Sequence, residues 1–251
     1  MKNIILVGSG NVATHLGISL LKQGYKIKQV WSNQLKNAEI LAKKLNSTAT
    51  NKIDSLQSAD LYIISVKDDI LENIIQQLNN VNIVHTSGSA ELEIFKNRFQ
   101  NYGVLYPLQT FKKEISLDLS NTPICIEASN PVFNKKLVDI ATKLSNDIMV
   151  MDSEQRKQLH IAAVFACNFT NHMFGIANNI LNKSNLDFKL LLPIIKQSIK
   201  KLDQYQPCDI QTGPAKRKDK KIIRKHINNI KDSKTKQIYK LISASIMNEN
   251  A

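Results

Sequence analysis

Short apolar runs alternate with helix-like spacings of apolar residues between residues 3 and 151. Most of the runs are continuous, which is typical of strands buried in a parallel sheet. In between, apolar residues such as Val12, Leu16 and Leu20 recur every four positions and share one face of a helix. The pattern predicts strands at 3–7, 26–31, 61–66, 81–85, 102–106, 123–127 and 148–151, and helices at 12–23, 35–45, 70–78 and 134–144. This alternation predicts an α/β fold with a doubly wound, parallel sheet of the Rossmann type.

The pattern changes after residue 151. Asp152 and Gln155 have the spacing of a capping box, which marks the start of a helix. No proline follows until Pro193, so one long helix is predicted at 153–181, with further helices at 188–203, 215–230 and 235–247. No strand-like alternation occurs in this part of the sequence. We therefore expect two domains, a sheet-containing domain of residues 1–151 and an all-α domain of residues 152–251.

The composition is that of an ordinary globular protein, with 43% hydrophobic and 22% charged residues among 251. Cys125, Cys167 and Cys208 are far apart in the sequence, so neither a disulfide framework nor a metal site is expected. The apolar run at residues 4–7 is too short for a signal or membrane helix. We therefore expect a cytoplasmic protein without a metal and without a membrane partner.

The chain is basic, with a formal net charge of +13 and a pI near 9.6. This balance has two explanations: a surface that binds a polyanion, or a general enrichment in lysine. We expect the lysines to be spread along the chain, and aromatic residues do not interleave with them, which favours the second explanation. The exception is the basic run at 216–221. Nucleic acid, bound through residues 216–225, is therefore the weakest of the partners considered.

The segment Gly8-Ser9-Gly10-Asn11-Val12-Ala13 joins the first predicted strand to the first predicted helix. Its GxGxxA pattern is the fingerprint of dinucleotide-binding folds. Gly8 permits a tight turn, Gly10 lets a pyrophosphate approach the backbone, and Ala13 lets helix and strand pack closely. The amides at the start of the helix would face the phosphates. All six residues are predicted to bind the cofactor, and the alternative is a tight turn that holds no ligand.

The end of the second predicted strand indicates which dinucleotide is bound. NAD sites usually carry Asp or Glu there to hold the ribose 2′-hydroxyl, whereas this chain has Trp31-Ser32-Asn33-Gln34. Because a carboxylate would repel a 2′-phosphate, its absence favours NADP over NAD. Ser32, Asn33 and Lys36 are the candidate donors to that phosphate. The alternative is that they are ordinary turn and helix-cap residues.

Five segments together resemble one protein family. They are GSGNVATHL at 8–16, HTSGS at 85–89, YPLQTF at 106–111, LHIAAVFACNFTNH at 159–172 and QTGPA at 211–215. The family comprises bacterial Rossmann-like proteins, catalogued as NADP oxidoreductase-like, with a helical C-terminal domain of unknown function. It is similar to the 6-phosphogluconate dehydrogenase C-terminal-like group, with pyrroline-5-carboxylate reductases and 3-hydroxyisobutyrate dehydrogenases as distant relatives.

The resemblance implies a nicotinamide bound over the carboxyl ends of the strands and a helical domain that closes the cleft. It also implies a homodimer formed through that domain. Related NADP-preferring sequences commonly carry Arg where this chain has Gln34.

The segment HTSGS at 85–89 follows a predicted buried strand, so it emerges at the edge of the sheet where ligands bind. Hydroxyls and free amides in this place can bind a carboxylate or carbonyl oxygen. We predict a catalytic role for Ser87 and substrate contacts for Gly88 and Ser89. Thr86 and Val66 are assigned to the cofactor. The alternative is a plain turn after the strand.

Polar side chains interrupt the apolar character of the predicted long helix. His160 and Asn171, eleven residues apart, lie within about 20° of the same helical face, and Asn168 and His172 lie about 6 Å apart along its axis. In relatives a polar pair on this helix, often Lys and Asn, orients the substrate and moves a proton. This chain has no lysine between positions 157 and 183. We predict that His172 or His160 protonates a reduced carbonyl or imine and that Asn168 orients the acid, the alternative for each histidine being a structural role.

The segment 211–219 joins two predicted helices, and Pro214 suits the first turn of the second. Amides at that helix start, with Thr212 and Arg217, form a predicted anion site for the substrate, and Gln109 of the YPLQTF motif is also assigned to the substrate. The alternative for this segment is a helix cap with a solvated basic face.

Two functions are consistent with these observations. The first is an NADP-linked oxidoreductase that acts on a small acid carrying a carbonyl, imine or alcohol in the cleft between the domains. The second is an NADP(H)-binding regulatory protein without turnover, which the missing lysine favours. The His, Asn and Ser side chains that are predicted to meet in that cleft favour the oxidoreductase.

Overall fold

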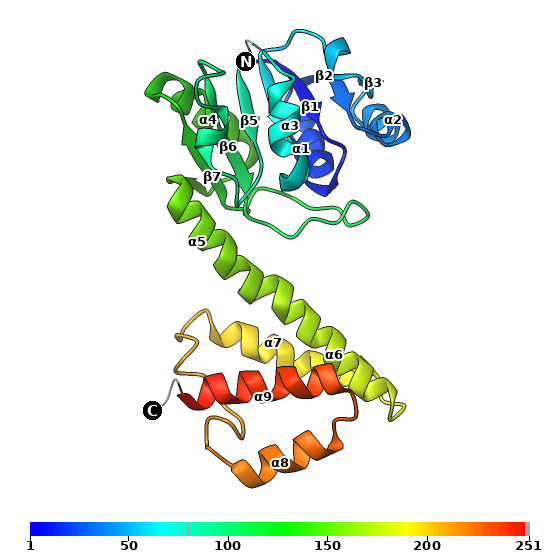
Figure 1. Cartoon of the computed structure of the whole chain (residues 1–251), viewed down its shortest axis with the longest axis vertical. Coiled ribbons are helices and arrows are strands. Elements are labelled where there is room, and N and C mark those ends of the chain that lie inside the picture. Colours follow the sequence, from blue (N-terminus) through cyan, green and yellow to red (C-terminus); the bar gives the residue numbers. More distant parts are fainter. Residues whose placement is uncertain (80, 249–251) are drawn as a thin grey trace. The chain divides into compact units, whose positions relative to one another are not determined.

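The computed structural model describes residues 1–79 and 81–248, and the strands among them form one sheet of eight strands. They are β1 (Asn3–Val7), β2 (Lys26–Trp31), β3 (Thr48–Thr50), β4 (Leu61–Ile64), β5 (Ile83–His85), β6 (Tyr102–Pro107), β7 (Ile124–Ala128) and β8 (Ile148–Val150). In space they follow the order β3-β2-β1-β4-β5-β6-β7-β8 (Figure 1). The strand order reverses at β1, which is where doubly wound folds bind their ligands.

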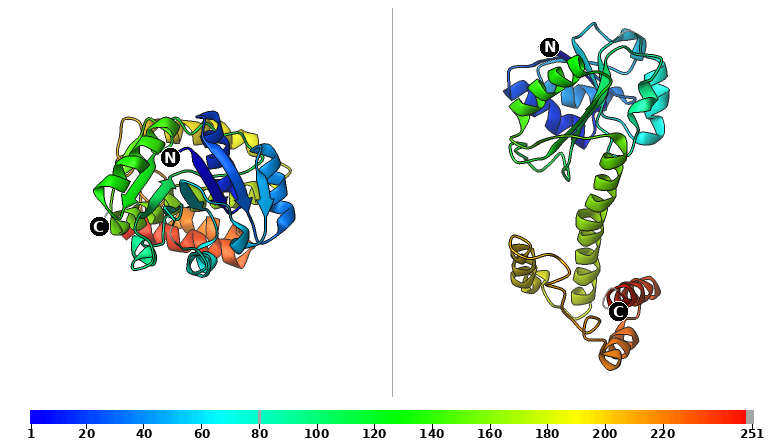
Figure 2. Two further views of the ribbon diagram at one scale, coloured as in Figure 1. Left: turned by 90° about the horizontal axis from the view of Figure 1, so that it is seen from above. Right: turned by 90° about the vertical axis from the view of Figure 1, so that its left-hand side faces the viewer.

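Helices cover both faces of the sheet, with α4 on one side and α3 on the other (Figure 2). Alternate residues of β1 enter the two cores, Ile4 and Leu6 on the side of α1, α2 and α4, and Ile5 and Val7 on the side of α3. These four side chains are fully buried, which explains why the first strand is a continuous apolar run. The helices are α1 (Asn11–Lys22), α2 (Leu35–Lys44), α3 (Asp68–Gln76) and α4 (Pro131–Leu144).

The α/β architecture with a helical C-terminal region is as predicted, but the sheet is only mostly parallel. β7 runs antiparallel to β6, with Tyr106 opposite Cys125, and β8 runs parallel to β7. The prediction of a wholly parallel sheet is therefore wrong for these two strands. Residues 108–123 connect β6 to β7 without a helix, and Leu119 of this connection is buried in the core. A parallel neighbour needs a long crossover, usually helical, whereas a loop returns the chain antiparallel.

One continuous helical segment follows β8. The Asp152 carboxylate accepts the Gln155 amide at 2.8 Å and the Gln155 side chain accepts the Asp152 amide at 3.2 Å, so the predicted capping box is confirmed. The segment comprises α5 (Ser153–Ala163), a π-helical stretch (Val164–Phe169) and α6 (Thr170–Asn182). Because a π-helical turn holds more residues than an α-helical turn, it rotates the later side chains. The predicted common face of His160 and Asn171, which assumes a uniform α-helix, is therefore wrong.

The chain divides into two compact units, residues 1–168 and 169–251, which part within this helical segment. The predicted domain boundary near Asp152 coincides with the start of α5, and α5 belongs to the first compact unit. The second unit contains α6, a short 3-10 helix (Phe188–Leu191), α7 (Leu192–Lys201), α8 (Lys220–Asn229) and α9 (Ser233–Asn248). No strand occurs among its described residues.

The helix predicted at 215–230 begins only at Lys220. Residues 214–218 form turns, and the Asp219 amide donates to the Pro214 carbonyl at 2.8 Å. The Asp219 carboxylate then caps α8 by accepting the Ile222 amide at 3.1 Å. The helix start predicted at Pro214 is therefore wrong, because Asp219 is the stronger N-cap.

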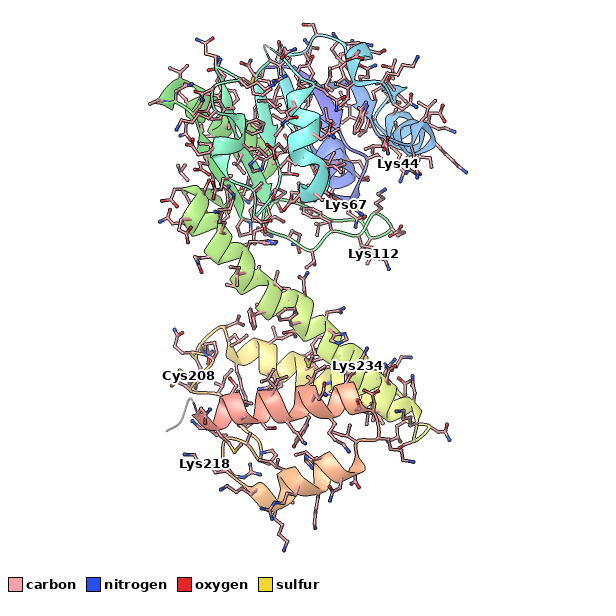
Figure 3. All side chains as sticks on the ribbon, in the orientation of Figure 1. Lys44, Lys67, Lys112, Cys208, Lys218 and Lys234 are labelled. Atoms are coloured by element: carbon pink, nitrogen blue, oxygen red, sulfur yellow. The ribbon has the colours of Figure 1, made fainter. Side chains whose placement is uncertain are left out.

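Positive charge is concentrated in the second unit. Residues 169–251 carry 16 Lys and Arg against 6 Asp and Glu, which is ten of the thirteen net positive charges. The lysines themselves are spread along the chain, as expected, and exposed ones occur on both units, for example Lys67 and Lys112 on the first and Lys218 and Lys234 on the second (Figure 3). No helix among the described residues is long and apolar enough to span a membrane.

Candidate cofactor and proton-transfer site

The turn after β1 is built so that only glycine fits its first position. Gly8 has a φ of +126°, and a Cβ atom on it would lie 2.2 Å from the carbonyl oxygen of Ser65. The Gly8 amide donates to the Trp31 carbonyl at 2.8 Å, and the Ser65 amide donates to the Val7 carbonyl at 2.8 Å. The turn is thus held between β2 and β4 at the carboxyl edge of the sheet.

The first turn of α1 is open. Its N-cap is the exposed Gly10, which has no side chain to cap the helix, and its first turn contains no acidic residue. Behind it Ala13 is fully buried, and a Cβ atom on Gly17 would lie 2.7 Å from Leu6 and 2.8 Å from Leu45. The helix therefore packs closely on the sheet and directs its first amides, and the positive end of its dipole, at the place where a pyrophosphate would bind. These residues fit a dinucleotide.

The carboxyl end of β2 lies beside this turn, where the Ser9 hydroxyl donates to the Ser32 hydroxyl at 2.9 Å. Asn33 is exposed, and α2 begins at an exposed N-cap, Gln34, whose side chain does not cap the helix. The first turn of α2 contains no acidic residue, and Lys36 is exposed there. Hydroxyl, amide and ammonium donors without a carboxylate fit a ribose 2′-phosphate better than a bare 2′-hydroxyl.

The ends of β4 and β5 continue the same edge. The Thr86 amide donates to the Ile64 carbonyl at 3.1 Å, and the Thr86 hydroxyl donates to the Ser65 hydroxyl at 3.0 Å. Val66 is half-buried directly after Ser65. The predicted cofactor residues Val66 and Thr86 therefore follow adjacent strands, next to the Gly8 turn.

The loop after β5 is fixed by its own side chains. The Ser87 hydroxyl accepts the amides of Ser89 and Ala90 at 3.1 and 3.0 Å, and the Ser89 hydroxyl donates to the Asp68 carboxylate at 2.5 Å. His85 is fully buried, and its Nδ1 accepts the Ser87 amide at 3.2 Å. Burial, with the nearby Arg156 cation, lowers the pKa of His85 to about 3, so its ring is neutral. In this structure Ser87 therefore shapes the loop.

Next to that loop, Tyr106 of β6 meets His160 of α5. The Tyr106 hydroxyl and His160 Nδ1 are 2.9 Å apart. Burial raises the pKa of Tyr106 to about 12, so its phenol keeps its proton. A Cβ atom on Gly88 would lie 2.6 Å from His160 Nδ1 and 2.8 Å from the Tyr106 ring, so the loop packs directly on the pair. His160 is among the predicted catalytic residues, but Tyr106 is not, although its place at the end of a buried strand is the signal that identifies it.

A buried ion pair holds α5 in this position. The Arg156 guanidinium is fully buried and donates to the Glu127 carboxylate on β7, to the Ala90 carbonyl, and to the Ser153 hydroxyl at 3.2 Å. Ser153 in turn donates to Glu127 at 2.8 Å. Arg156 thus joins α5 to the sheet and to the loop that follows β5. No feature of the sequence marks Arg156 as buried, because an arginine one turn into a capped helix is usually solvated.

The remaining predicted residues lie outside this cluster or in the other unit. Asn168 is exposed and lies eight residues after His160, within the π-helical stretch. Gln109 is exposed, and its carboxamide oxygen accepts the Thr110 amide at 2.8 Å. His172, Thr212 and Arg217 belong to the second unit, where His172 and Arg217 are exposed. Their roles stay predictions.

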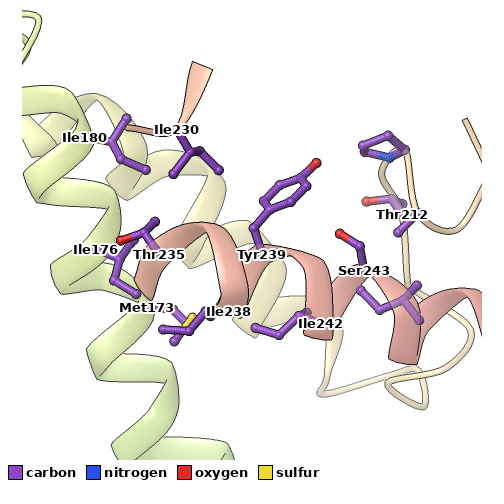
Figure 4. Close-up of a pocket in the computed structure, with 13 residues that line it drawn as sticks. Met173, Ile176, Ile180, Thr212, Ile230, Thr235, Ile238, Tyr239, Ile242 and Ser243 are labelled. Carbon is purple, nitrogen blue, oxygen red and sulfur yellow. The ribbon is translucent and has the colours of Figure 1, made fainter. Parts of the chain in front are cut away.

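The second unit has an apolar pocket of about 270 Å³ (Figure 4). α6 contributes Met173 and Ile176, and α9 contributes Ile238 and Ile242. Thr212 also lines it, and none of the described residues in its wall is charged. The pocket therefore lacks the cationic groups of an anion site.

Two family descriptions match the chain. Residues 3–86 match the NADP oxidoreductase, coenzyme F420-dependent family, and residues 122–246 match a domain of unknown function, DUF2520. No curated protein matches the chain.

Solved structures match it over nearly the whole length. A protein from Bacteroides fragilis, provisionally described as an NADP oxidoreductase, is 39% identical with a TM-score of 0.91, and the match covers 98% of each chain. A protein from Thermotoga maritima is 21% identical with a TM-score of 0.76, covering 98% of this chain and 99% of that one. An imine reductase from Myxococcus stipitatus in complex with NADP⁺ shares the fold, at 13% identity and a TM-score of 0.62, covering 98% and 92%. The chain therefore belongs to the family of Rossmann-type NADP oxidoreductase-like proteins with a C-terminal helical domain of unknown function.

Proposed function

We propose that the chain is an NADP(H)-dependent oxidoreductase that transfers a hydride to or from a small acid carrying a carbonyl, imine or alcohol. The proposal rests on the groups that lie together at the carboxyl edge of the sheet. The open first turn of α1 lies behind the Gly8 turn, and the Tyr106–His160 pair lies at the end of β6 on the same edge. A phosphate site beside proton-bearing side chains is what a nicotinamide-dependent reaction needs.

NADP is proposed in preference to NAD. Ser32, Asn33 and Lys36 offer donors at the end of β2, and no carboxylate lies there to hold a 2′-hydroxyl. One charge-assisted hydrogen bond to the 2′-phosphate contributes about 1.5–3 kcal/mol, which corresponds to roughly ten- to a hundredfold tighter binding of NADPH than of NADH.

A carbonyl or imine carbon is proposed as the hydride acceptor. Structures that share the fold include imine reductases and a reductive aminase in complex with NADPH and ethyl-5-oxohexanoate. Asn168 and His172 stay candidates for the catalytic roles expected from the sequence, and we further propose that Gln109, Thr212 and Arg217 take part in substrate binding. Arg217 is the side chain among them suited to a carboxylate, because its guanidinium can donate two parallel hydrogen bonds.

The helical part is also proposed to form a homodimer. Leu190 and Ile194 are 64% exposed and Leu241 is 74% exposed, all in the second unit. Large apolar side chains that are this exposed are typical of an interface. Light scattering after gel filtration tests this: a mass of twice 28.3 kDa is expected, and a monomer at micromolar concentration contradicts it.

The proposed activity is tested by oxidation of NADPH with three candidate acceptors: pyruvate, 5-oxohexanoate and the cyclic imine 1-pyrroline-5-carboxylate. Turnover of any of them, faster with NADPH than with NADH, supports the proposal. Tight NADPH binding without turnover of any acceptor favours the regulatory alternative. Absence of binding of either cofactor contradicts both functions.

A further inference from the structure

The Tyr106–His160 pair lies at the edge of the sheet along which the nicotinamide half of a bound dinucleotide would extend. β1, β4, β5 and β6 are consecutive neighbours in the sheet, so the end of β6 lies about 14 Å from the Gly8 turn at the usual strand spacing. The direction is away from β2, where the adenosine half would bind. The nicotinamide half would therefore extend from the Gly8 turn toward the ends of β4, β5 and β6.

We propose that Tyr106 is the catalytic proton donor to the substrate oxygen or nitrogen, and that His160 is the positioning residue that donates to Tyr106 through Nδ1. The inference rests on the proposed function and adds to it the residue that completes the reduction. It requires neither Asn168 nor His172.

The direction of the hydrogen bond decides the role of each group. If His160 Nδ1 accepts the phenol proton, that proton is unavailable to a substrate. If Nδ1 carries a proton, it donates to the Tyr106 oxygen at 2.9 Å, and the phenol O–H is free to point toward the ligand edge. The imidazolium form satisfies this and also holds a proton to replace the one that Tyr106 gives away.

When bound, NADPH supplies a hydride to the substrate carbon, and the electron pair of the C=O or C=N bond moves to the oxygen or nitrogen. Tyr106 breaks its O–H bond to give this atom a proton. His160 passes its Nδ1 proton to the phenolate, which restores Tyr106 and leaves a neutral imidazole. The half-buried His160 ring regains a proton from water. The sum is one hydride and one proton added to the double bond.

Three surrounding features prepare the pair for this role. Arg156 holds α5 one turn before His160, so the ring is placed by a buried anchor. Gly88 leaves the space that the two rings occupy. The rings meet nearly edge to face, at 76° and 5.9 Å between centroids, so the phenol keeps one orientation.

The test requires no substrate. Tyr106 is replaced by 3,5-difluorotyrosine, which ionises near neutral pH, and its titration is followed by ¹⁹F NMR in the full chain. NADP⁺ carries a positive ring and NADPH a neutral one. If the phenol lies beside the nicotinamide, NADP⁺ raises its ionisation constant about tenfold or more, while NADPH and 2′-phospho-ADP-ribose leave it nearly unchanged.

His160→Ala provides the second arm. Loss of a donor to the phenolate lowers the ionisation constant about ten- to a hundredfold, and His160→Asn, whose amide can still donate, recovers part of it. Difluorotyrosine at Tyr102 is the matched control. It lies four residues earlier on β6, about 13 Å away, and its titration stays constant in every arm.

The outcomes separate the two proposals. If NADP⁺ does not bind, the proposed function fails and the inference with it. If NADP⁺ binds but neither NADP⁺ nor His160→Ala changes the titration of position 106, the proton-donor role is overturned while the proposed function stands. Should the fluorinated chain not fold, the ¹³Cζ chemical shift of Tyr106 in the unmodified, [¹³Cζ]tyrosine-labelled chain, assigned by Tyr106→Phe, is compared at one pH between NADP⁺ and NADPH and between the parent and His160→Ala.

Discussion

Removal of the Arg156 side chain tests how the helix that carries His160 is held. The Arg156 side chain is 1% exposed and its partner Glu127 is 14% exposed, so both charges are withdrawn from water. Arg156→Met fills much of the same volume but removes the guanidinium that donates to the Glu127 carboxylate and the Ala90 carbonyl. Breaking a buried pair from one side costs about 3–5 kcal/mol. Because Glu127 keeps some water and its bond from Ser153, we expect about 3 kcal/mol.

The assay is urea unfolding followed by Trp31 fluorescence. Trp31 is the only tryptophan and is buried in β2, so it reports on the first unit. With a slope of about 2 kcal/mol/M, the midpoint should fall by about 1.5 M. Lys157→Met is the matched control on the same helix. Its exposed pair with Glu91 should contribute less than about 1 kcal/mol. The double variant with Arg156→Met and Glu127→Gln should have a free energy of unfolding at least about 1 kcal/mol higher than Arg156→Met alone, because Glu127→Gln removes the unpaired charge. A loss below about 1 kcal/mol in Arg156→Met would refute this account of the anchor.

Three further predictions concern the site. His85 has a folded pKa of about 3, below its unfolded value, so the unfolded state binds more protons between about pH 6.5 and 3 and stability falls as pH falls through this window. In the parent chain the free energy of unfolding, measured by urea titration, should change by up to about 1.4 kcal/mol per pH unit because of His85, and this pH dependence should be smaller in His85→Gln. The same pH dependence in the parent and in His85→Gln would contradict this prediction. Gly88→Ala should force the Tyr106 and His160 rings apart and lower turnover about tenfold or more, with NADPH affinity within about twofold; unchanged kinetics would mean the loop adjusts. Arg217→Ala should raise KM more than it lowers kcat if it binds a substrate carboxylate, and an equal KM would remove it from the site.

The elements of the sheet could be predicted from sequence because burial on both faces leaves continuous apolar runs. Ile4 to Val7 are all fully buried, and they form the first predicted strand. β3 has only three residues and lies at the edge of the sheet, so it is too short to show an alternation of apolar and polar residues in the sequence. The antiparallel direction of β7 depends on residues 108–123, which connect it to β6 without a helix. The path of this connection is fixed by the burial of Leu119 in the core. Such a tertiary contact cannot be recognised from a local sequence pattern.

The candidate site was predictable where one local motif determines the geometry. The Gly8 turn needs a positive φ and lacks room for a Cβ atom, and both requirements select glycine in the sequence. The Tyr106–His160 and Arg156–Glu127 pairs join residues 54 and 29 positions apart, and neither spacing marks a motif. The π-helical stretch likewise changes the face of the long helix without a proline or glycine to mark it in the sequence.

The central claim is that the Gly8–Ala13 turn holds NADP(H), and Gly10→Val tests it most directly. A Cβ atom on Gly10 would meet no atom nearer than the Ser65 carbonyl oxygen at 4.0 Å, and the φ of Gly10 is −73°, so the folded chain accommodates a side chain there. A bound pyrophosphate needs the same space. Calorimetric titration with NADPH should show binding to the unchanged chain and a loss of about a hundredfold or more in Gly10→Val, whose thermal unfolding without cofactor should match the parent. Equal NADPH affinity in a folded Gly10→Val chain would contradict the account.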